Sequence, residues 1–220
     1  MEHKRITIFC GHYGSGKSNL AVNFARSLRD AGERVTLADL DIVNPYFRSA
    51  DSKAELERQG IRLVVSEYAN TNLDAPALPA EIYSLCDPRL GSVVIDLGGD
   101  DRGALALGRL RHRILQENDF SMVFVLNGYR PLTRTPEEAA EVIQEVAAAA
   151  GLPITALVNN SNLGEETTAE AVLDSVAFAE KTAAMTALPL LGTCAEKSLC
   201  PALAGKLEPL FPLELQEKYY

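Results

Sequence analysis

Short apolar runs alternate along the chain with longer segments in which apolar residues recur at helical spacing. The short runs are typical of buried strands, and the longer segments are typical of amphipathic helices. The expected strands span residues 6–10, 34–38, 61–65, 92–96, 120–126, 154–158 and 188–192. The expected helices span residues 20–30, 49–59, 102–116, 136–150 and 169–182, with a last helix in the tail after Pro201. This alternation predicts an α/β three-layer sandwich, a mostly parallel sheet with helices on both faces.

The clearest helix boundaries are those of the segment that follows Arg134. Thr135 is suited to cap the helix, Pro136 to occupy its first position, and Glu137 and Glu138 to face the positive end of its dipole, while Gly151 closes it. The chain has 220 residues and contains no internal repeat, linker or low-complexity segment. We therefore expect one domain over residues 1–220.

Composition and charge narrow the range of partners. The formal net charge of −9 argues against broad electrostatic binding to nucleic acid, which needs concentrated Lys and Arg. The first strand is preceded only by a short polar stretch, and no apolar run reaches the length of a membrane span. The four cysteines are scattered without CxxC spacing and three histidines give no accompanying ligand cluster. We expect a cytoplasmic protein with reduced thiols and no membrane contact.

A glycine-rich segment lies between the first strand and the first helix. It matches the pattern G-x-x-x-x-G-K-[ST] of a phosphate-binding P-loop, in the strand-loop-helix context that such a loop needs. Its nucleotide-binding candidates are Gly11, His12, Tyr13, Gly14, Ser15, Gly16, Lys17, Ser18 and Asn19. The backbone N–H groups would surround phosphate, Lys17 would contact the β- and γ-phosphates, and the Ser18 hydroxyl would bind Mg²⁺. The alternative is a glycine turn with Ser18 as an ordinary helix cap.

Two further strands end in acidic residues. Asp39 and Asp41 follow the second strand, where they would share a face and hold a Mg²⁺-bound water or the water that attacks the γ-phosphate. In the alternative, Asp41 belongs to a turn with Asn44 and Pro45. Asp96 ends the strand at 92–96 and is followed by Gly98-Gly99, which matches a Walker B strand and adds a third carboxylate near Mg²⁺.

Three other segments carry polar groups that suit a ligand. The turn-rich stretch 68–79 is either a functional loop or a static surface loop. Arg130 follows the strand at 120–126, where it either meets phosphate or lies on the surface. The asparagine run 159–162 suits either the edge of a nucleotide base or a turn.

Together, the P-loop, Asp39-Leu40-Asp41, Val94 to Gly99 and Val158-Asn159 resemble the MinD/ParA/Mrp group of P-loop ATPases over nearly the whole chain. The resemblance implies a P-loop NTPase fold with ATP and Mg²⁺ as cofactors. It also implies that Lys17 and the loop amides bind phosphate and that Ser18 ligates Mg²⁺. Asp41 in the first switch would orient the attacking water, Asp96 would belong to the second switch, and Asn159 would read adenine. Members act as switches that often dimerise face to face around ATP.

One departure from that group lies inside the loop. Its members carry a second lysine just after the first glycine, which reaches the partner's phosphates, and here His12 stands at that position. An imidazole is a weaker electrostatic substitute whose charge depends on pH. Slow hydrolysis, a different dimer or partner-dependent activity would each fit this change.

Three functions remain open from the sequence. The first is an ATPase switch that binds ATP and ADP, forms a nucleotide-dependent homodimer and acts on an unidentified protein partner. The second is a small-molecule kinase or ATP-dependent ligase on the same scaffold, and the third is a regulatory module that hardly hydrolyses nucleotide. ATP is preferred over GTP because Asn159-Asn160-Ser161-Asn162 lacks the lysine and aspartate of an N-K-x-D motif.

Overall fold

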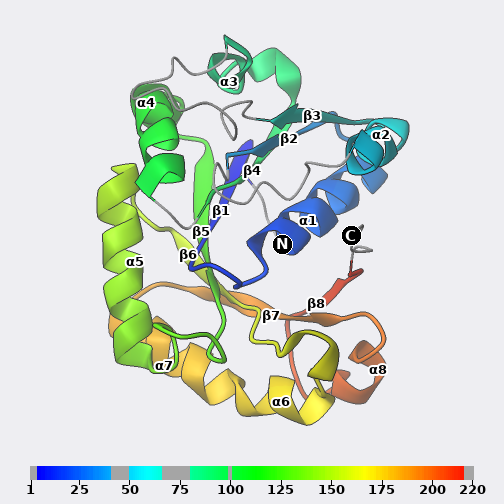
Figure 1. Ribbon diagram of the computed structural model, residues 1–220, viewed down its shortest axis with the longest axis vertical. Helices are drawn as coiled ribbons and strands as arrows, with labels where there is room; N and C mark the ends of the chain where they lie inside the picture. The colour runs from blue at the N-terminus through cyan, green and yellow to red at the C-terminus, as the bar shows by residue number, and fades with distance from the viewer. Residues whose placement is uncertain (1–3, 41–49, 66–79, 99–100, 216–220) are drawn as a thin grey trace.

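The computed structural model describes residues 4–40, 50–65, 80–98 and 101–215. Its centre is an eight-stranded sheet with the order β3-β2-β4-β1-β5-β6-β7-β8, in which each pair of neighbours is parallel (Figure 1). The strands are β1 Ile6–Cys10, β2 Val35–Asp39, β3 Ile61–Val65, β4 Ser92–Asp96, β5 Phe120–Leu126, β6 Ala156–Asn159, β7 Leu190–Glu196 and β8 Leu210–Leu213.

Helices cover both faces of this sheet. On one side lie α1 and α2, and on the other side lie α4, α5 and α7 (Figure 1). The α-helices are α1 Lys17–Asp30, α2 Ala50–Arg58, α3 Ala80–Ser84, α4 Asp101–Glu117, α5 Pro136–Ala150, α6 Ala169–Asp174, α7 Val176–Thr186 and α8 Cys200–Leu203, and short 3₁₀ turns are η2 Pro88–Leu90 and η3 Gly164–Glu166. This arrangement confirms the predicted α/β three-layer sandwich.

The central strands are buried on both faces, which explains their uninterrupted apolar runs. Every residue of β1 is buried, and its side chains alternate between two cores. Ile6, Ile8 and Cys10 pack into the core beneath α4, α5 and α7, whereas Phe9 packs into the core beneath α1. This alternation anchors the start of the glycine loop from both sides of the sheet.

The boundaries predicted for α5 are confirmed. The Thr135 hydroxyl accepts from the Glu138 N–H, the Glu138 carboxylate accepts from the Thr135 N–H, and Pro136 is the first helical residue. Gly151 ends the helix in the left-handed conformation. Local capping chemistry therefore defines both ends of this helix.

The C-terminal part differs from the sequence prediction. The helix expected at 169–182 is divided at Ser175 into α6 and α7, and the strand expected at 188–192 is β7, which starts and ends later. In its described part, up to residue 215, the tail holds a four-residue helix and then β8, a strand that the sequence did not predict. Pro212 argued against a strand, because proline cannot donate a hydrogen bond to a sheet. However, β8 is an edge strand, where proline is tolerated.

Candidate nucleotide-binding site

The glycine loop joins β1 to α1 at the carboxyl end of the sheet. Gly11, Gly14 and Gly16 have φ angles of +148°, +75° and +86°, which other residues rarely adopt. A Cβ atom on Gly11 would lie 2.7 Å from the Val125 carbonyl oxygen, and one on Gly16 would lie 2.3 Å from Asn160 Nδ2. The glycines are therefore needed both for backbone conformation and for close packing.

The first turn of α1 has no side-chain cap. Gly16 is the N-cap residue and no side chain bonds to the helix N-terminus there. Ser18 is the second residue of the helix, so it does not have the capping role considered above. An uncapped helix N-terminus that follows a glycine loop presents N–H groups and a positive dipole end to an anion.

Lys17 folds back over the loop that precedes it. Its side chain is 5% exposed, and Nζ donates a hydrogen bond of 3.3 Å to the His12 carbonyl oxygen. The ammonium group therefore lies over the first half of the loop, while the Lys17 backbone begins α1. Within the described residues, the buried Ser15 Oγ has no hydrogen-bond partner, so a polar group inside the loop keeps its bonding capacity.

Two strand-end carboxylates lie beside the loop. Asp39 of β2 and Asp96 of β4 are register neighbours, and Asp96 also pairs in register with Phe9 of β1, two residues before Gly11. Both aspartates are buried. Carboxylate oxygens are the hard donors that Mg²⁺ prefers, so Asp39 and Asp96 suit the metal that the sequence implies. Asp41 and the segment 68–79 lie outside the described residues.

Asn159 does not line the pocket that adjoins the glycine loop. Its side chain is fully buried, Nδ2 donates to Ser175 Oγ at 2.9 Å, and Oδ1 accepts from the N–H and the hydroxyl of Ser161. These bonds join β6 to the break between α6 and α7. With its amide engaged in this way, Asn159 has no group left for a base, and the adenine contact inferred from the family resemblance is not supported in this conformation.

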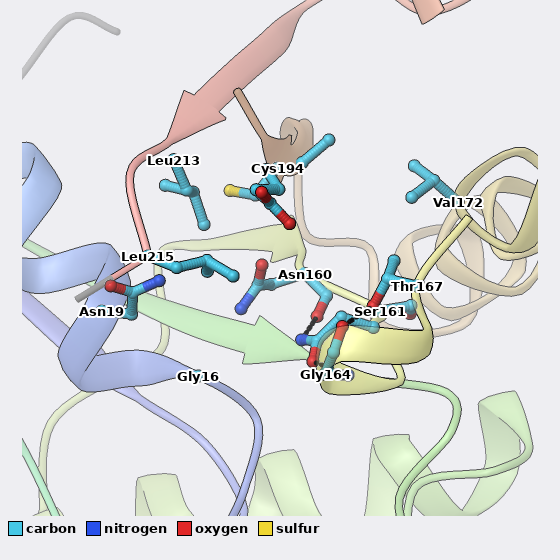
Figure 2. Close-up of a pocket in the computed structure, with 13 residues that line it drawn as sticks. Gly16, Asn19, Asn160, Ser161, Gly164, Thr167, Val172, Cys194, Leu213 and Leu215 are labelled. Atoms are coloured by element: carbon cyan, nitrogen blue, oxygen red, sulfur yellow. Dashed lines mark hydrogen bonds between the residues drawn. The ribbon is translucent and has the colours of Figure 1, made fainter. Parts of the chain in front are cut away.

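Asn160 faces the loop instead. Its side-chain Nδ2 donates to the Ser15 backbone carbonyl oxygen at 2.8 Å, and the Asn160 backbone carbonyl oxygen accepts from Asn162 Nδ2 at 2.7 Å. Figure 2 shows the pocket around it, between the start of α1 and the ends of β7 and β8. The pocket is lined by Gly16, Asn19, Asn160, Ser161, Asn162, Gly164, Thr167, Val172, Cys194, Ala195, Glu196, Leu213 and Leu215. It continues directly from the helix end of the glycine loop.

The CobQ/CobB/MinD/ParA nucleotide-binding domain model matches residues 6–171 of the chain. The chain belongs to this family. The match begins with β1, includes the glycine loop, Asp39, Asp96 and Asn160, and ends inside α6. The protein therefore has a nucleotide-binding P-loop domain of the CobQ/CobB/MinD/ParA family, while the pocket residues contributed by β7 and β8 lie beyond the matched region. Comparison with curated protein sequences gives no significant match.

Solved structures share the fold of this family member at low identity. FtsY from Thermotoga maritima is 16% identical with a TM-score of 0.56, over 86% of this chain and 61% of that one. The signal recognition particle 54 kDa protein from Aeropyrum pernix K1, in complex with GDP, is 16% identical with a TM-score of 0.55, over 87% and 41%. FtsY from Mycoplasma mycoides is 14% identical with a TM-score of 0.54, over 88% and 62%. The chain thus spans less than two thirds of each of these structures.

The pKa of the His12 imidazole lies below its ordinary value in this family member. Burial, and after it the neighbouring Lys17 charge, lowers the pKa of the His12 imidazole. A lowered pKa favours the neutral form of the ring near pH 7. The position at which the resemblance expects a second lysine therefore adds less positive charge than a lysine would.

Arg130 answers one question that the sequence left open. It follows β5, and its Nε donates a 3.0 Å hydrogen bond to the Gly14 carbonyl oxygen. Arg130 therefore lies beside the phosphate-binding loop, as the phosphate interpretation requires, and not on a remote part of the surface. The sequence analysis included Asn160 in the run 159–162 but named Asn159 as the contact to the base, and it did not select the end of β7.

None of the described helices has the length and hydropathy that a membrane-spanning segment needs. The described residues also contain no group of three or more His, Cys, Asp and Glu side chains arranged around a common metal position.

Proposed function

We propose that this P-loop domain binds ATP with Mg²⁺, hydrolyses it and acts as a nucleotide-driven switch on a protein partner. The observation that carries the proposal is Lys17, a buried lysine at the start of α1. Its ammonium group lies over the first half of the glycine loop, and the N-terminus of α1 has no side-chain cap. A buried cation is costly unless an anion compensates it, and the phosphates of a nucleotide are the anion that such a loop accommodates.

The phosphates and the base of the nucleotide bind in two different regions of the site. The loop amides and Lys17 bind the phosphates, with the β- and γ-phosphates at the His12 end where Nζ lies. The base enters the pocket beside Asn160, which adjoins the other end of the loop at Gly16 and Asn19. Asn160 and Asn162 then offer amide groups to the base edge, in the role first given to Asn159.

The metal and the attacking water belong to the acidic strand ends. Ser18, Asp39 and Asp96 would hold Mg²⁺ directly or through water, and the metal supplies charge neutralisation of the phosphates. Asp41 keeps the proposed role of orienting the water. Hydrolysis is slow or depends on a partner, because His12, whose neutral form is favoured, does not stabilise the charge that a second lysine would.

Exposed apolar side chains on the same edge of the sheet support a partner or a second copy of the chain. Tyr13 in the glycine loop is 66% exposed, Leu132 after β5 is 62% exposed and Leu163 after β6 is 44% exposed. All three lie on loops that leave the carboxyl ends of neighbouring strands. A surface that surrounds the nucleotide in this way transmits the nucleotide state to whatever covers it.

GTP is the second candidate nucleotide, because Glu196 lies in the pocket. Its carboxylate, which accepts from the Ser198 hydroxyl at 2.9 Å, can also accept hydrogen bonds from the N–H groups of guanine. The absence of an N-K-x-D motif still favours ATP. Competition between ATP and GTP for a fluorescent ADP analogue decides this point, with GTP established if it displaces the probe at lower concentration.

Binding and hydrolysis by wild type and Lys17→Ala test the proposed function. Wild type should bind a fluorescent ATP analogue in the presence of Mg²⁺ and release inorganic phosphate from ATP. Lys17→Ala should lose tight binding, because the β- and γ-phosphates lose their cation. The matched control is Lys181→Ala, an exposed lysine on α7 that should bind as wild type does. If Lys17→Ala bound the ATP analogue as tightly as wild type does, the glycine loop would not be the phosphate-binding site.

A further inference from the structure

Arg130 is held against the glycine loop by a rigid turn after β5. Its N–H donates to the Asn127 carbonyl oxygen at 3.2 Å, and the Thr133 hydroxyl donates to the same oxygen at 2.8 Å. Asn127 Oδ1 in turn accepts from the Tyr129 N–H at 3.1 Å. Asn127 and Thr133 are both buried, so this turn has little freedom, and the Arg130 guanidinium starts from a fixed backbone position.

The guanidinium uses only part of its bonding capacity. Nε bonds to the Gly14 carbonyl oxygen, and no acceptor among the described residues bonds to the two Nη groups. A planar guanidinium presents its donors as a fork that matches the oxygens of a phosphate. Anchored through Nε, the fork keeps its Nη donors for a ligand at the loop.

Arg130 approaches the glycine loop from the side of the site where the phosphates bind. Arg130 leaves β5, the direct neighbour of β1, whereas the base pocket is built by β6, β7 and the end of β8. At one end of the loop, Lys17 Nζ bonds to His12, where the proposed function places the β- and γ-phosphates. At the other end, Gly16 lies against Asn160, beside the base pocket. Gly14 lies between them, so an arginine on the β5 side of Gly14 faces phosphate rather than base.

The charge balance of the loop also calls for a second cation. Lys17 is a single charge, and the lowered pKa of His12 disfavours a second charge within the loop. Arginine stays protonated in proteins, so the charge of Arg130 does not vary over the physiological pH range. It is a permanent positive charge that the same chain places beside the loop.

We propose that Arg130 contacts the γ-phosphate of the bound nucleoside triphosphate and supplies, within the same subunit, a second positive charge beside that of Lys17. This inference rests on the proposed function and adds a specific role to it. Because ADP has no γ-phosphate, Arg130 makes the site prefer the triphosphate over the diphosphate. The residue also stabilises the charge that develops on the transferred phosphoryl group during hydrolysis.

The test compares affinities for a non-hydrolysable ATP analogue and for ADP, both with Mg²⁺, by calorimetric titration. Arg130→Gln should weaken the ATP analogue by about 10- to 100-fold, the range for a lost charge-assisted hydrogen bond, and should change ADP by less than about 3-fold. Arg134→Gln is the matched control, because Arg134 is an exposed arginine in the same loop, and it should behave as wild type. Arg130→Lys, which keeps the charge but loses the fork, should fall between wild type and Arg130→Gln.

Three results would overturn the inference. An equal loss of affinity for both nucleotides would mean that Arg130 only maintains the loop through Gly14. Wild-type affinities in Arg130→Gln would mean that it does not meet phosphate at all. Wild type that binds neither nucleotide would remove the proposed function as well, which separates that failure from the first two. Melting by circular dichroism confirms that each variant is folded, and Arg130→Lys alone carries the comparison if Arg130→Gln is not.

Discussion

Replacing Gly16 by alanine tests the contact that joins the glycine loop to the pocket. At this position φ is +86°, and an added Cβ would lie 2.3 Å from Asn160 Nδ2, the atom that donates to the Ser15 carbonyl oxygen. Asn160 would have to swing away and leave the Ser15 carbonyl without that donor. The variant therefore combines a strained backbone with the loss of a buried hydrogen bond.

Each part of this cost has a known magnitude. Holding an L-residue in the left-handed conformation costs about 1–2 kcal/mol, and losing the hydrogen bond costs about 0.5–1.5 kcal/mol. Alanine recovers about 0.4–1 kcal/mol by reducing the entropy of the unfolded chain. The expected net loss in the free energy of unfolding is about 0.5–3 kcal/mol, which combines these ranges.

A matched control separates the two parts. Gly32 has φ of +88°, and an added Cβ there would meet no atom within 4 Å, so Gly32→Ala carries the backbone strain alone. Urea unfolding followed by circular dichroism suits the measurement, because the chain has no tryptophan. Gly16→Ala should lose more stability than Gly32→Ala. The double variant Gly16→Ala/Asn160→Ala should be more stable than the sum of its single variants predicts, because the same hydrogen bond is lost in each.

Two results would refute this reasoning. If Gly16→Ala and Gly32→Ala lost equal stability, the contact with Asn160 would have no energetic weight. If the double variant were additive within about 0.5 kcal/mol, residues 16 and 160 would not be coupled.

Two further predictions follow from titratable groups whose pKa is shifted by full or partial burial. Because burial lowers the pKa of His12 in the folded state, the unfolded chain takes up the proton first, and stability should fall as the pH drops below about 6.5; His12→Asn should lack this part of the slope in unfolding measured from pH 7.5 to 5, and an identical slope would contradict the burial of the ring. Burial raises the pKa of the Cys10 thiol to about 12, so iodoacetamide at pH 8 should leave Cys10 unmodified in the folded protein and alkylate it in urea. Peptide mapping by mass spectrometry measures this, and native labelling at the rate of an exposed thiol would show that β1 opens readily.

Local signals in the sequence were sufficient for much of the fold. The capping residues of α5 and the glycine pattern after β1 each act within a few residues, and both predictions agree with the structure. The alternation of strands and helices gave the parallel sheet, because parallel strands need crossover helices. These features depend on short-range physics, which a single sequence carries in full.

The remainder depends on long-range contacts. Whether Asn159 or Asn160 faces the loop is decided by Ser175, which takes up the Asn159 amide from another element of the chain. Strand β8 exists only because β7 offers it an edge, although Pro212 counts against a strand locally. Arg130 reaches Gly14 across a separation of 116 residues, which no local pattern reveals.

The switch itself is tested most directly by the molar mass of the protein with different nucleotides. Light scattering in the presence of Mg²⁺ should give a monomer of 23.8 kDa with ADP and twice that mass with a non-hydrolysable ATP analogue. Lys17→Ala should remain a monomer in both. A mass that does not change between ADP and the ATP analogue, in a protein that binds both, would contradict a nucleotide-driven dimer and would direct attention to the alternative of a phosphoryl acceptor.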